Sequence, residues 1–466
     1  MTGRDQEAEP EVSDLDKIFK AYDIRGVVPD ELDEGVAEAV GAAFVKLTGA
    51  NQLVTLHDMR TSSEPLANAI ARGAASQGAN VIAGGLGSTD MVYYASGFLD
   101  VPGIMVTASH NPAKYNGLKL CKAGAKPVGI ETGLAEIKQY VIDGVPADKS
   151  KTPGTVTGKD LLPGYAGYLK KLVDISGIRP LKVVVDAGNG MAGHTVPTVF
   201  AGLPIDLVPL YFELDGTFPN HEANPIDSDN LRDLQKAVKE NKADIGLAFD
   251  GDADRCFVVD EKGEIVSPSV LTALIATREL KREPGTTVIH NLITSRGVPE
   301  IIREHGGTPV RTRVGHSFIK AKMAETNAIF GGEHSGHFYF RDFWFADSGM
   351  LAALHTLAAL GTDSRPLSEI LTDYSRYVAS GEINSEVADQ AAVTATIKNI
   401  YAERPGVTVD ELDGLTVSGD SWWFNLRPSN TEPLLRFNAE APTEAEMSAL
   451  RDEVLGLVRN TTDRSE

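Results

Sequence analysis

The chain has 466 residues, of which 42% are hydrophobic and 23% charged, a composition typical of globular proteins. This length exceeds what one hydrophobic core supports, so we expect two to four domains. The net charge of −21, from 65 acidic and 44 basic residues, argues against non-specific binding to nucleic acid or to anionic membranes. Any phosphate-binding site must therefore concentrate its basic groups locally.

The two cysteines, Cys121 and Cys256, stand far apart in the sequence. This usage fits a reducing compartment and no disulfide framework. Residues 1–14 are polar and acidic and lack the apolar core of a signal peptide. We find no run of about 18 apolar residues of the kind that spans a membrane. We therefore expect a cytoplasmic protein with a short flexible leader.

Strands and helices alternate from about residue 51 onward. Ser62 and Ser63 as caps and Pro65 in the first turn predict a helix that stops near Gly78. The polar segment 148–159 predicts a linker between domains. Apolar runs predict strands at 53–57, 81–83 and 103–107, with a helical stretch at 91–98.

The same alternation restarts twice and then changes character. The last segment predicts two strands around a loop, followed by a helix. We therefore expect three α/β units of roughly 100 residues each and a smaller α+β unit. The elements that indicate this are strands at 181–185 and 245–249, a helix from Val270, strands near Val288 and Val310, strands at 422–426 and 434–437, and a helix from Thr443.

Three carboxylates alternate directly after the buried strand at 245–249: Asp250, Asp252 and Asp254. Open α/β sheets bind ligands at the carboxyl ends of their strands. Carboxylates about 4 Å apart repel by on the order of 4 kcal/mol per pair at an effective dielectric of about 20. Mg²⁺ relieves that repulsion and leaves positions for phosphate oxygens, so we predict a magnesium site.

Three alternatives to a magnesium site deserve comparison. An EF-hand is disfavoured although Glu261 falls at its twelfth position, because Arg255 stands where the sixth must be glycine and the flanks are strands. An aspartyl-phosphate enzyme would use Asp250 as a nucleophile. A solvated acidic turn would have no chemical role. The last two remain open from these residues alone.

Ser109 lies in a small polar loop that follows the strand at 103–107, and Lys119 follows it along the chain. Serine and asparagine are common in turns, so a plain loop is one interpretation. A serine hydrolase is disfavoured because the Gly-x-Ser-x-Gly elbow is missing. His110 is adjacent in sequence, and we expect its side chain not to converge on that of Ser109. Combined with a magnesium site, a phosphoserine is the best interpretation.

The segment 188–193 matches the dinucleotide-binding pattern G-x-G-x-x-G after a strand, and Asp206 lies near the distance expected of a ribose-binding acid. However, Asp206 precedes the apolar run 207–210 instead of closing a strand. We therefore interpret the segment as a structural turn whose glycines permit tight packing.

Two further polar loops follow predicted strands. In the loop at 331–337, Glu333 and Ser335 have groups suited to sugar hydroxyls, and the flanking glycines would permit close approach. In the loop at 427–433, Arg427 stands beside serine, asparagine and threonine donors, a combination suited to phosphate. A turn without a ligand remains open for both.

These four loops, in this order and spacing, resemble the α-D-phosphohexomutase family, in its bacterial phosphomannomutase/phosphoglucomutase branch. The likeness extends from Lys20-Ala21-Tyr22-Asp23-Ile24-Arg25-Gly26 to the last loop. It implies an α/β protein with three similar α/β domains and a smaller α+β C-terminal domain around a central cleft. We place these domains at 1–155, 156–264, 265–370 and 371–466.

The resemblance also implies roles for individual residues. Ser109 would be the phosphoserine, and it would join Asp250, Asp252 and Asp254 as ligands of one Mg²⁺ per chain. Lys119, Arg25 and the histidines, in that order, are the candidates for general acid and base. The catalytic positions it implies are Ser109, Lys119, Arg25, His110, His316 and His337. The substrate-binding positions are Tyr22, Arg255, Glu333, Ser335, Arg427, Ser429, Asn430 and Thr431.

The implied activity is that of an isomerase acting on small phosphosugars. Phosphoserine would phosphorylate a hexose 1- or 6-phosphate, and the hexose 1,6-bisphosphate, both intermediate and activator, would return its other phosphate to Ser109. Asn430 favours a mannose or glucose enzyme, whereas Ile293 stands where some relatives carry a substrate-contacting lysine. We expect a monomer or weak dimer without nucleic-acid or membrane partners.

Alternatives to this function remain. A phosphoglucosamine mutase would share the same loops. A non-catalytic protein that binds Mg²⁺ and phosphosugars would need no exchange of phosphate, and an aspartyl-phosphate enzyme would not use Ser109.

Overall fold

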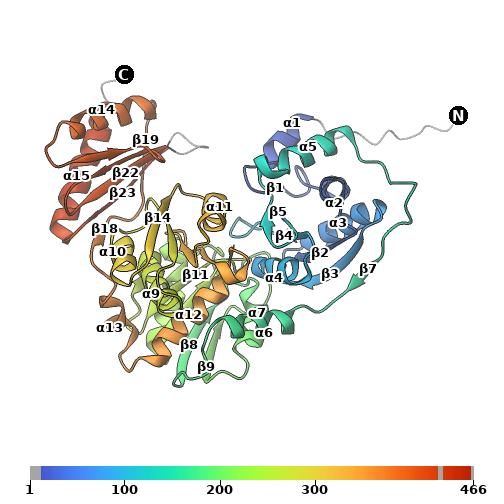
Figure 1. The fold of residues 1–466 in the computed structure, drawn as a ribbon, viewed down its shortest axis with the longest axis horizontal. Helices are drawn as coiled ribbons and strands as arrows, with labels where there is room; N and C mark the ends of the chain where they lie inside the picture. Colours follow the sequence, from blue (N-terminus) through green and yellow to red (C-terminus); the bar gives the residue numbers. More distant parts are fainter. Residues whose placement is uncertain (1–11, 429–433, 463–466) are drawn as a thin grey trace. The chain divides into compact units, whose positions relative to one another are not determined.

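A computed structural model describes residues 12–428 and 434–462 (Figure 1). The chain forms two compact units. Unit 1 contains the residues up to 266 together with 335–368, and unit 2 contains 267–334 together with the residues from 369 onward. Within the described residues, unit 1 has two β-sheets and a β-hairpin, and unit 2 has three parallel strands and an antiparallel sheet, with helices in both units.

The first sheet of unit 1 is mixed and has the strand order β1-β5-β4-β2-β3-β7, with β6 beside β5. β2 pairs in parallel with β3 and β4, whereas β5 is antiparallel to β4 and β1. The strands are β1 (Ile24–Val27), β2 (Gln52–His57), β3 (Asn80–Leu86), β4 (Gly103–Val106), β5 (Tyr115–Lys122), β6 (Lys126–Pro127) and β7 (Val156–Gly158). The helices are α1 (Val12–Ile18), α2 (Glu34–Thr48), α3 (Ser63–Ser76), α4 (Thr89–Leu99) and α5 (Leu134–Asp143).

Two predictions for this sheet need correction. The predicted linker 148–159 contains β7, which pairs in parallel with β3 at the sheet edge. All three residues of β7 are exposed, so they carry no hydrophobic pattern that would reveal a strand. Ser62 precedes α3, but its side chain makes no capping hydrogen bond to the helix.

The second sheet of unit 1 has the order β12-β11-β10-β8-β9. β8 pairs in parallel with β9 and β10, and β11 is antiparallel to β10. The strands are β8 (Leu181–Asp186), β9 (Ile205–Leu210), β10 (Ile245–Phe249), β11 (Cys256–Asp260) and β12 (Ile265–Val266). The helices are α6 (Leu162–Leu172), α7 (Ala192–Phe200) and α8 (Arg232–Asn241), and unit 1 also contains the hairpin of β16 (Phe338–Phe340) and β17 (Ala346–Asp347) and the buried helix α12 (Gly349–Thr362).

The glycine segment between β8 and α7 serves packing. A Cβ at Gly190 would lie 2.7 Å from the carbonyl oxygen of Gly251, and one at Gly193 would lie 2.3 Å from that of Phe212. Gly188 has a φ of +52°, which favours glycine. The predicted structural role of these glycines is confirmed.

Unit 2 contains the parallel strands β14, β13 and β15, in this order, and a C-terminal sheet whose pairs are all antiparallel. The parallel strands are β13 (Thr287–Asn291), β14 (Thr308–Thr312) and β15 (Phe330–Gly332), with α9 (Pro268–Arg282), α10 (Gly297–Glu304) and α11 (His316–Thr326). The C-terminal strands are β18 (Val378–Ala379), β19 (Ile383–Glu386), β20 (Thr408–Asp410), β21 (Leu415–Ser418), β22 (Trp423–Pro428) and β23 (Leu434–Ala441), with α14 (Gln390–Ala402) and α15 (Glu444–Thr462). The short helix α13 (Leu367–Thr372) precedes this sheet in the chain.

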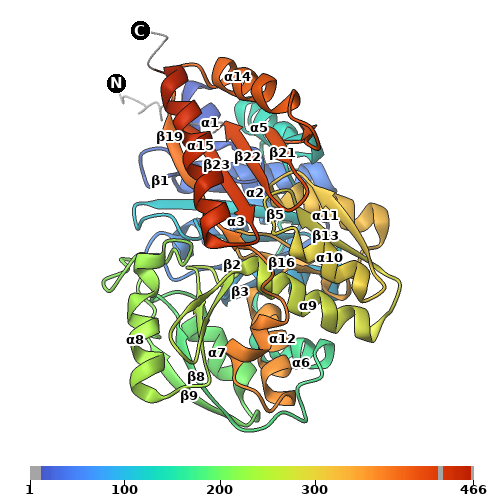
Figure 2. The same cartoon turned by 90° about the vertical axis from the view of Figure 1, so that its left-hand side faces the viewer.

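The two sheets of unit 1 share one pattern of strand pairing, because β1-β5-β4-β2-β3 has the same parallel and antiparallel pairs as β12-β11-β10-β8-β9, although β1 comes first and β12 last in the chain order of its sheet. The Ser109 loop connects β4 to β5, and the carboxylate loop connects β10 to β11. Each loop thus follows a strand of the parallel part of its sheet and leads into the neighbouring antiparallel strand. The last sheet, with α14 and α15 in orange and red in Figure 2, has no such parallel core. The predicted fold class, three α/β domains and an α+β domain, is confirmed, whereas the boundaries between the domains stay a prediction.

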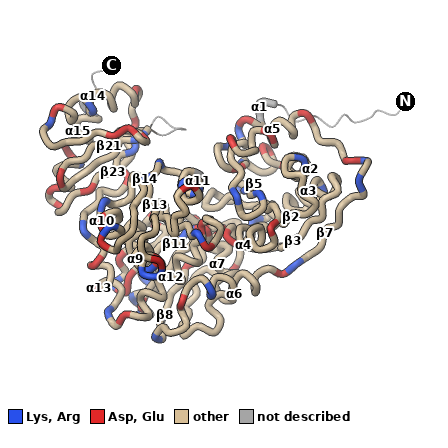
Figure 3. The backbone as a smooth tube through the Cα atoms, viewed as in Figure 1, with Lys and Arg blue, Asp and Glu red and all other residues tan. Residues whose placement is uncertain are grey.

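Charged residues of both signs are interspersed along both units (Figure 3). Among the described residues, no helix is both long enough and apolar enough to cross a bilayer.

Gly73 tests the packing of α2 against α3. An alanine Cβ there would lie 1.9 Å from the carbonyl oxygen of Glu38, so Gly73→Ala forces the helices apart. We expect a loss of about 1–3 kcal/mol, measured by urea unfolding. The control Gly167→Ala, in α6 with no atom within 4 Å of the new Cβ, should leave stability unchanged or raise it by about 0.5–1 kcal/mol. An unchanged urea midpoint for Gly73→Ala would contradict this close packing.

Candidate functional site

Ser109 lies at the carboxyl end of β4 and exposes only 2% of its surface. Its φ of +50° is left-handed, a conformation that costs a non-glycine residue about 1–2 kcal/mol. Its amide donates to Thr107 Oγ1 at 2.9 Å, and its hydroxyl donates to Asp250 Oδ2 at 2.8 Å. The serine of the first sheet therefore directly contacts the carboxylate loop of the second.

The carboxylate loop buries Asp250, Asp252 and Asp254, each at most 1% exposed. One oxygen from each lies within 4.8 Å of those of the other two. Asp252 Oδ1 and Asp254 Oδ1 are buried and accept no hydrogen bond from the described residues. Buried acceptors without donors are costly, and clustered carboxylate oxygens are the ligands that hard divalent cations prefer. These residues therefore fit a magnesium-type ion.

Two basic side chains partly compensate the three carboxylates. Lys119 Nζ lies 2.7 Å from Asp252 Oδ2 and 2.6 Å from Asp254 Oδ2. Arg255 Nε lies 3.5 Å from Asp250 Oδ2. With all five groups ionised, the cluster has a net charge of −1. A bound divalent cation would change this net charge to +1.

The pKa values of the carboxylates reflect this imbalance. Burial, with repulsion from its two neighbours, raises the pKa of Asp250 well above its ordinary value. Burial also opposes ionisation of Asp252 and Asp254, but the contacts with Lys119 outweigh it and lower the pKa of both. Asp250, the carboxylate in contact with Ser109, is therefore the member of the cluster that most readily holds a proton.

Two histidines flank Arg255. Its Nη2 donates to His110 Nδ1 at 3.0 Å, and its Nε donates to His337 Nε2 at 3.2 Å. His337 Nδ1 lies 3.0 Å from Ser335 Oγ, so Ser335 helps to orient this ring. Burial and the nearby guanidinium groups of Arg255 and Arg25 lower the pKa of His110, which keeps its ring neutral.

The expectation that Ser109 and His110 diverge is wrong. Ser109 Oγ lies 3.2 Å from His110 Nδ1. Neighbouring side chains point to opposite faces only in extended backbone, and the left-handed conformation of Ser109 ends the extended stretch.

Arg25 reaches the Ser109 loop from β1. Its Nη1 donates to Asn111 Oδ1 at 2.6 Å, and its Nη2 pairs with Asp23 Oδ2 at 2.6 Å. Tyr22, just before β1, is half-buried. Of the predicted site residues, the structure thus assembles Ser109, His110, Lys119, Arg25, Asp250, Asp252, Asp254, Arg255, Ser335 and His337 within unit 1.

Glu333 lies in unit 2 and exposes only 2% of its surface. Its Oε1 accepts from the amide of Gly315 at 3.2 Å and from Asn291 Nδ2 at 3.4 Å. A Cβ at Gly332 would lie 2.4 Å from Thr272 Oγ1. The absence of a side chain at Gly332 thus makes room for Thr272, and the close approach of a sugar to this loop stays a prediction.

Arg427, at the end of β22, exposes 12% of its side chain. Its guanidinium lies 3.6 Å from Glu382 and 3.9 Å from Asp413, so acidic residues hold it in place. The neighbouring Ser429, Asn430 and Thr431 lie outside the described residues, as does the side chain of His316.

Three residues of the site were missed from the sequence. Arg60, after β2, donates to the backbone of the Ser109 loop. Thr89 donates its hydroxyl to Asp252 Oδ2 at 2.6 Å and its amide to the Asp252 carbonyl at 2.9 Å. Asp90 is fully buried beside it and accepts from the hydroxyls of Tyr165 and Ser348, each at 2.6 Å, and from that of Ser88. Thr89 and Asp90 look like ordinary cap or turn residues in the sequence, and Arg60 looks like an ordinary charged residue of a loop.

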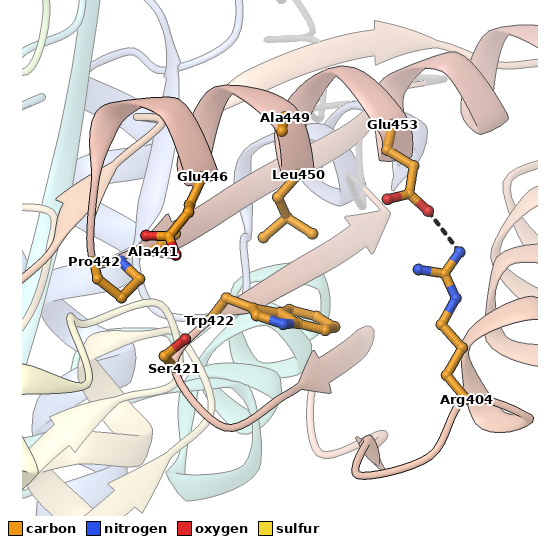
Figure 4. Close-up of a pocket in the computed structure, with 9 residues that line it drawn as sticks. All are labelled: Arg404, Ser421, Trp422, Ala441, Pro442, Glu446, Ala449, Leu450 and Glu453. Atoms are coloured by element: carbon orange, nitrogen blue, oxygen red, sulfur yellow. Dashed lines mark hydrogen bonds and ion pairs between the residues drawn. The ribbon is translucent and has the colours of Figure 1, made fainter.

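A separate pocket of about 280 Å³ lies in the C-terminal domain between α15 and the loop before β22 (Figure 4). Trp422 and Leu450 face it, and Arg404 pairs with Glu453 at one end. None of the predicted site residues that the structure describes lines it.

Most of the chain matches one protein family. Models of phosphoglucomutase/phosphomannomutase alpha/beta/alpha domains I, II and III match residues 16–145, 163–263 and 267–377, and the model of the C-terminal domain matches 382–457. A phosphomannomutase from Escherichia coli is 38% identical over 452 residues, covering 95% of this chain and 99% of the relative. A protein of Xanthomonas campestris named phosphohexose mutases is 40% identical over 444 residues, with 95% and 99% covered.

A crystal structure of a phosphoglucomutase/phosphomannomutase family protein from Burkholderia thailandensis superimposes with a TM-score of 0.85 at 34% identity, covering 95% of this chain and 97% of the other. The three α/β domains and the antiparallel fourth are thus those of a phosphohexomutase, which is an isomerase. The chain belongs to the phosphoglucomutase/phosphomannomutase family.

Asp90 predicts a pH dependence of stability. Burial raises the pKa of Asp90 from 3.8 to about 6. Between pH 4 and pH 6, Asp90 therefore holds a proton in the folded protein and releases it in the unfolded chain. Its contribution to stability is therefore greatest below pH 4 and falls as the pH rises toward 6. Asp90→Asn, of the same size, removes this loss. Relative to the parent, we expect the variant to gain on the order of 2 kcal/mol between pH 4 and pH 7 in urea unfolding. Parallel pH profiles for the two proteins would contradict the burial of an ionised Asp90.

Proposed function

We propose that this protein is a phosphomannomutase/phosphoglucomutase that interconverts hexose 1-phosphate and hexose 6-phosphate through phosphorylated Ser109. The observation that carries this proposal is the 2.8 Å contact between Ser109 Oγ and Asp250 in the buried carboxylate cluster. Names of relatives such as the Escherichia coli phosphomannomutase support a mannose or glucose substrate.

In the first transfer, an oxygen of the sugar hydroxyl forms a bond to phosphorus while the bond from phosphorus to Ser109 Oγ breaks. The hydroxyl proton goes to a base, and the product is a hexose 1,6-bisphosphate. In the second transfer, Ser109 Oγ bonds to the phosphorus at the other end, and the sugar oxygen that leaves takes a proton. The phosphate count is unchanged, so catalytic bisphosphate suffices to phosphorylate the resting enzyme.

Asp250, Asp252 and Asp254, with a phosphoryl oxygen on Ser109, would hold one Mg²⁺. When bound, Mg²⁺ neutralises charge on the transferring group and polarises it. The charge balance supports this pairing, because a phosphoserine adds roughly two negative charges to a site that is already negative. The Oδ1 atoms of Asp252 and Asp254, which accept no hydrogen bond from the described residues, support it as well.

Lys119, Arg25, His110 and His337 are the candidates for proton transfer. Burial opposes the charge of Lys119, but its contacts with Asp252 and Asp254 outweigh burial and raise its pKa, so it begins protonated. His110 begins neutral, and Arg255 donates to its Nδ1. Opposite starting protonation states suit a reaction that needs both an acid and a base.

We further propose that the remaining predicted residues bind the sugar and its other phosphate. Glu333 and Ser335 would bind hydroxyls, with Tyr22 and Arg255 on the substrate side of the metal. The phosphate that does not react would lie on the loop of Arg427, Ser429, Asn430 and Thr431. The buried guanidinium of Arg427, with acidic neighbours that fix its position, supports this assignment.

Ser109→Ala tests the proposal. We expect kcat for mannose 1-phosphate, with catalytic bisphosphate and Mg²⁺, to fall at least about 1,000-fold, because the group that carries phosphate is lost. The control Ser150→Ala removes an exposed serine that bonds only to Asp148 and should keep full activity. Near-normal turnover by Ser109→Ala would contradict the proposal.

The same samples separate the alternatives. Acid-stable phosphate on Ser109 that exchanges with labelled substrate supports the mutase, and phosphate that never exchanges favours a binding protein. Acid-labile phosphate points to Asp250. Faster turnover of glucosamine 6-phosphate than of the mannose and glucose phosphates would favour a phosphoglucosamine mutase.

A further inference from the structure

Arg60 is a buried arginine, 3% exposed, in the connection between β2 and α3. Its guanidinium donates to four carbonyl groups of the loop that contains Ser109. Nη2 donates to Ser109 O at 2.9 Å and Asn111 O at 2.6 Å, and Nη1 donates to Pro112 O and Tyr115 O, both at 2.9 Å.

The fifth N–H of this guanidinium is also used. Nε donates to Asp58 Oδ2 at 3.2 Å, so all five donors that an arginine has find acceptors. Asp58 is itself buried, and its Oδ1 accepts from the Arg60 amide at 3.0 Å and from the Ser63 hydroxyl. Asn116 Nδ2 donates to Ser63 Oγ at 2.8 Å, which ties the far end of the loop to the same network.

These bonds act on the part of the loop that is least stable by itself. Ser109 has a left-handed φ of +50°, which a serine does not prefer. Its carbonyl lies between Arg60 and Gly251, where a Cβ would come within 2.4 Å of the oxygen. The Ser109 carbonyl and the Ser109 side chain share one Cα, so the orientation of the carbonyl also fixes where the side chain points. The 2.8 Å contact between Ser109 Oγ and Asp250 therefore depends on it.

The second sheet of unit 1 also contributes to this contact. The guanidinium of Arg60 lies 5.1 Å from the centre of the Phe218 ring, and a Cβ at Gly216 would lie 2.6 Å from the Cα of Arg60. Arg60 is thus enclosed by the same domain that supplies the carboxylate loop.

We propose that Arg60 is a positioning residue that holds the Ser109 loop in the backbone conformation that aims the serine oxygen at the carboxylate cluster. This rests on the proposed function, since it concerns the phosphate carried by Ser109. Among the described residues, Arg60 makes no hydrogen bond to Ser109 Oγ or to a carboxylate of the cluster; it acts through the carbonyl groups of the loop.

The chemistry requires arginine. A lysine has three N–H donors on one nitrogen, so it cannot reach the five acceptors that surround the planar guanidinium of Arg60. Arg60→Lys therefore keeps the charge but leaves at least two of the five acceptors unpaired. Misplacement of a reacting group by about 1 Å costs on the order of 100-fold in rate.

The experiment compares Arg60→Lys and Arg60→Ala with the parent, at saturating bisphosphate and Mg²⁺, and normalises kcat to the folded fraction from circular dichroism. Arg72→Lys is the matched control, because Arg72 lies on α3, is half-exposed and pairs only with Glu34 and Glu38. We expect Arg60→Lys to lose about 50-fold or more in kcat per folded molecule, with KM for glucose 1-phosphate within about threefold. A few millimolar guanidinium chloride should raise kcat of Arg60→Ala at least about fivefold and leave the control unchanged.

Full kcat per folded molecule for Arg60→Lys, or no response of folded Arg60→Ala to guanidinium, would overturn the positioning role. Should Arg60→Lys not fold, Asp58→Asn replaces it, because it keeps the size of the side chain that faces Nε. Normal kcat for Asp58→Asn would likewise overturn the positioning role.

A parent that neither turns over hexose phosphates nor acquires phosphate on Ser109 would overturn the proposed function, and this inference with it. An active parent with a fully active Arg60→Lys overturns only this inference.

Discussion

The crowding of three buried carboxylates beside one serine hydroxyl is the constraint on which the site depends. Asp250, Asp252 and Asp254 are buried, and ion pairs with Lys119 and Arg255 compensate them only in part. Such a cluster is expensive to fold unless a cation relieves it, and a phosphate on the neighbouring serine would be unfavourable for the same reason. Under the proposed function, the metal ion and the phosphate would therefore each improve the binding of the other.

The α/β domains build their functional loops by one scheme. In each α/β domain, a residue at or after the end of one parallel strand (β2, β8 or β13) donates a hydrogen bond to the loop that contains the predicted site residues. Arg60, after β2, bonds to the Ser109 loop, and the amide of Met191, after β8, donates to the carbonyl of Gly251 at 2.9 Å. In unit 2, Asn291, the last residue of β13, donates to Glu333 at 3.4 Å. Supported loops of this kind lose less entropy when they bind a ligand, because their backbone is already ordered.

Local patterns predicted most of the strands and helices and the carboxylate cluster, whereas Arg25, Arg255 and His337 were named only from the family resemblance. Asp250, Asp252 and Asp254 follow a strand of five buried residues, a signal that needs no knowledge of the rest of the chain. The role of Arg60 was not predictable in this way, because its partners are carbonyl groups about fifty residues away, which every sequence possesses. The convergence of Ser109 and His110 depends on one left-handed residue, which serine does not signal. β7 was missed because an exposed edge strand has no apolar pattern.

Phosphorus NMR of the phosphorylated protein tests the central claim most directly. Mn²⁺, a paramagnetic substitute for Mg²⁺, would be added in small amounts while the phosphoserine resonance is observed. A cation held by Asp250, Asp252 and Asp254 lies next to Ser109, so the account predicts that this resonance broadens strongly at substoichiometric Mn²⁺ and that Asp252→Asn weakens the effect. A phosphoserine resonance that stays sharp while Mn²⁺ binds would contradict the account, because the ion and the phosphate would then occupy separate places.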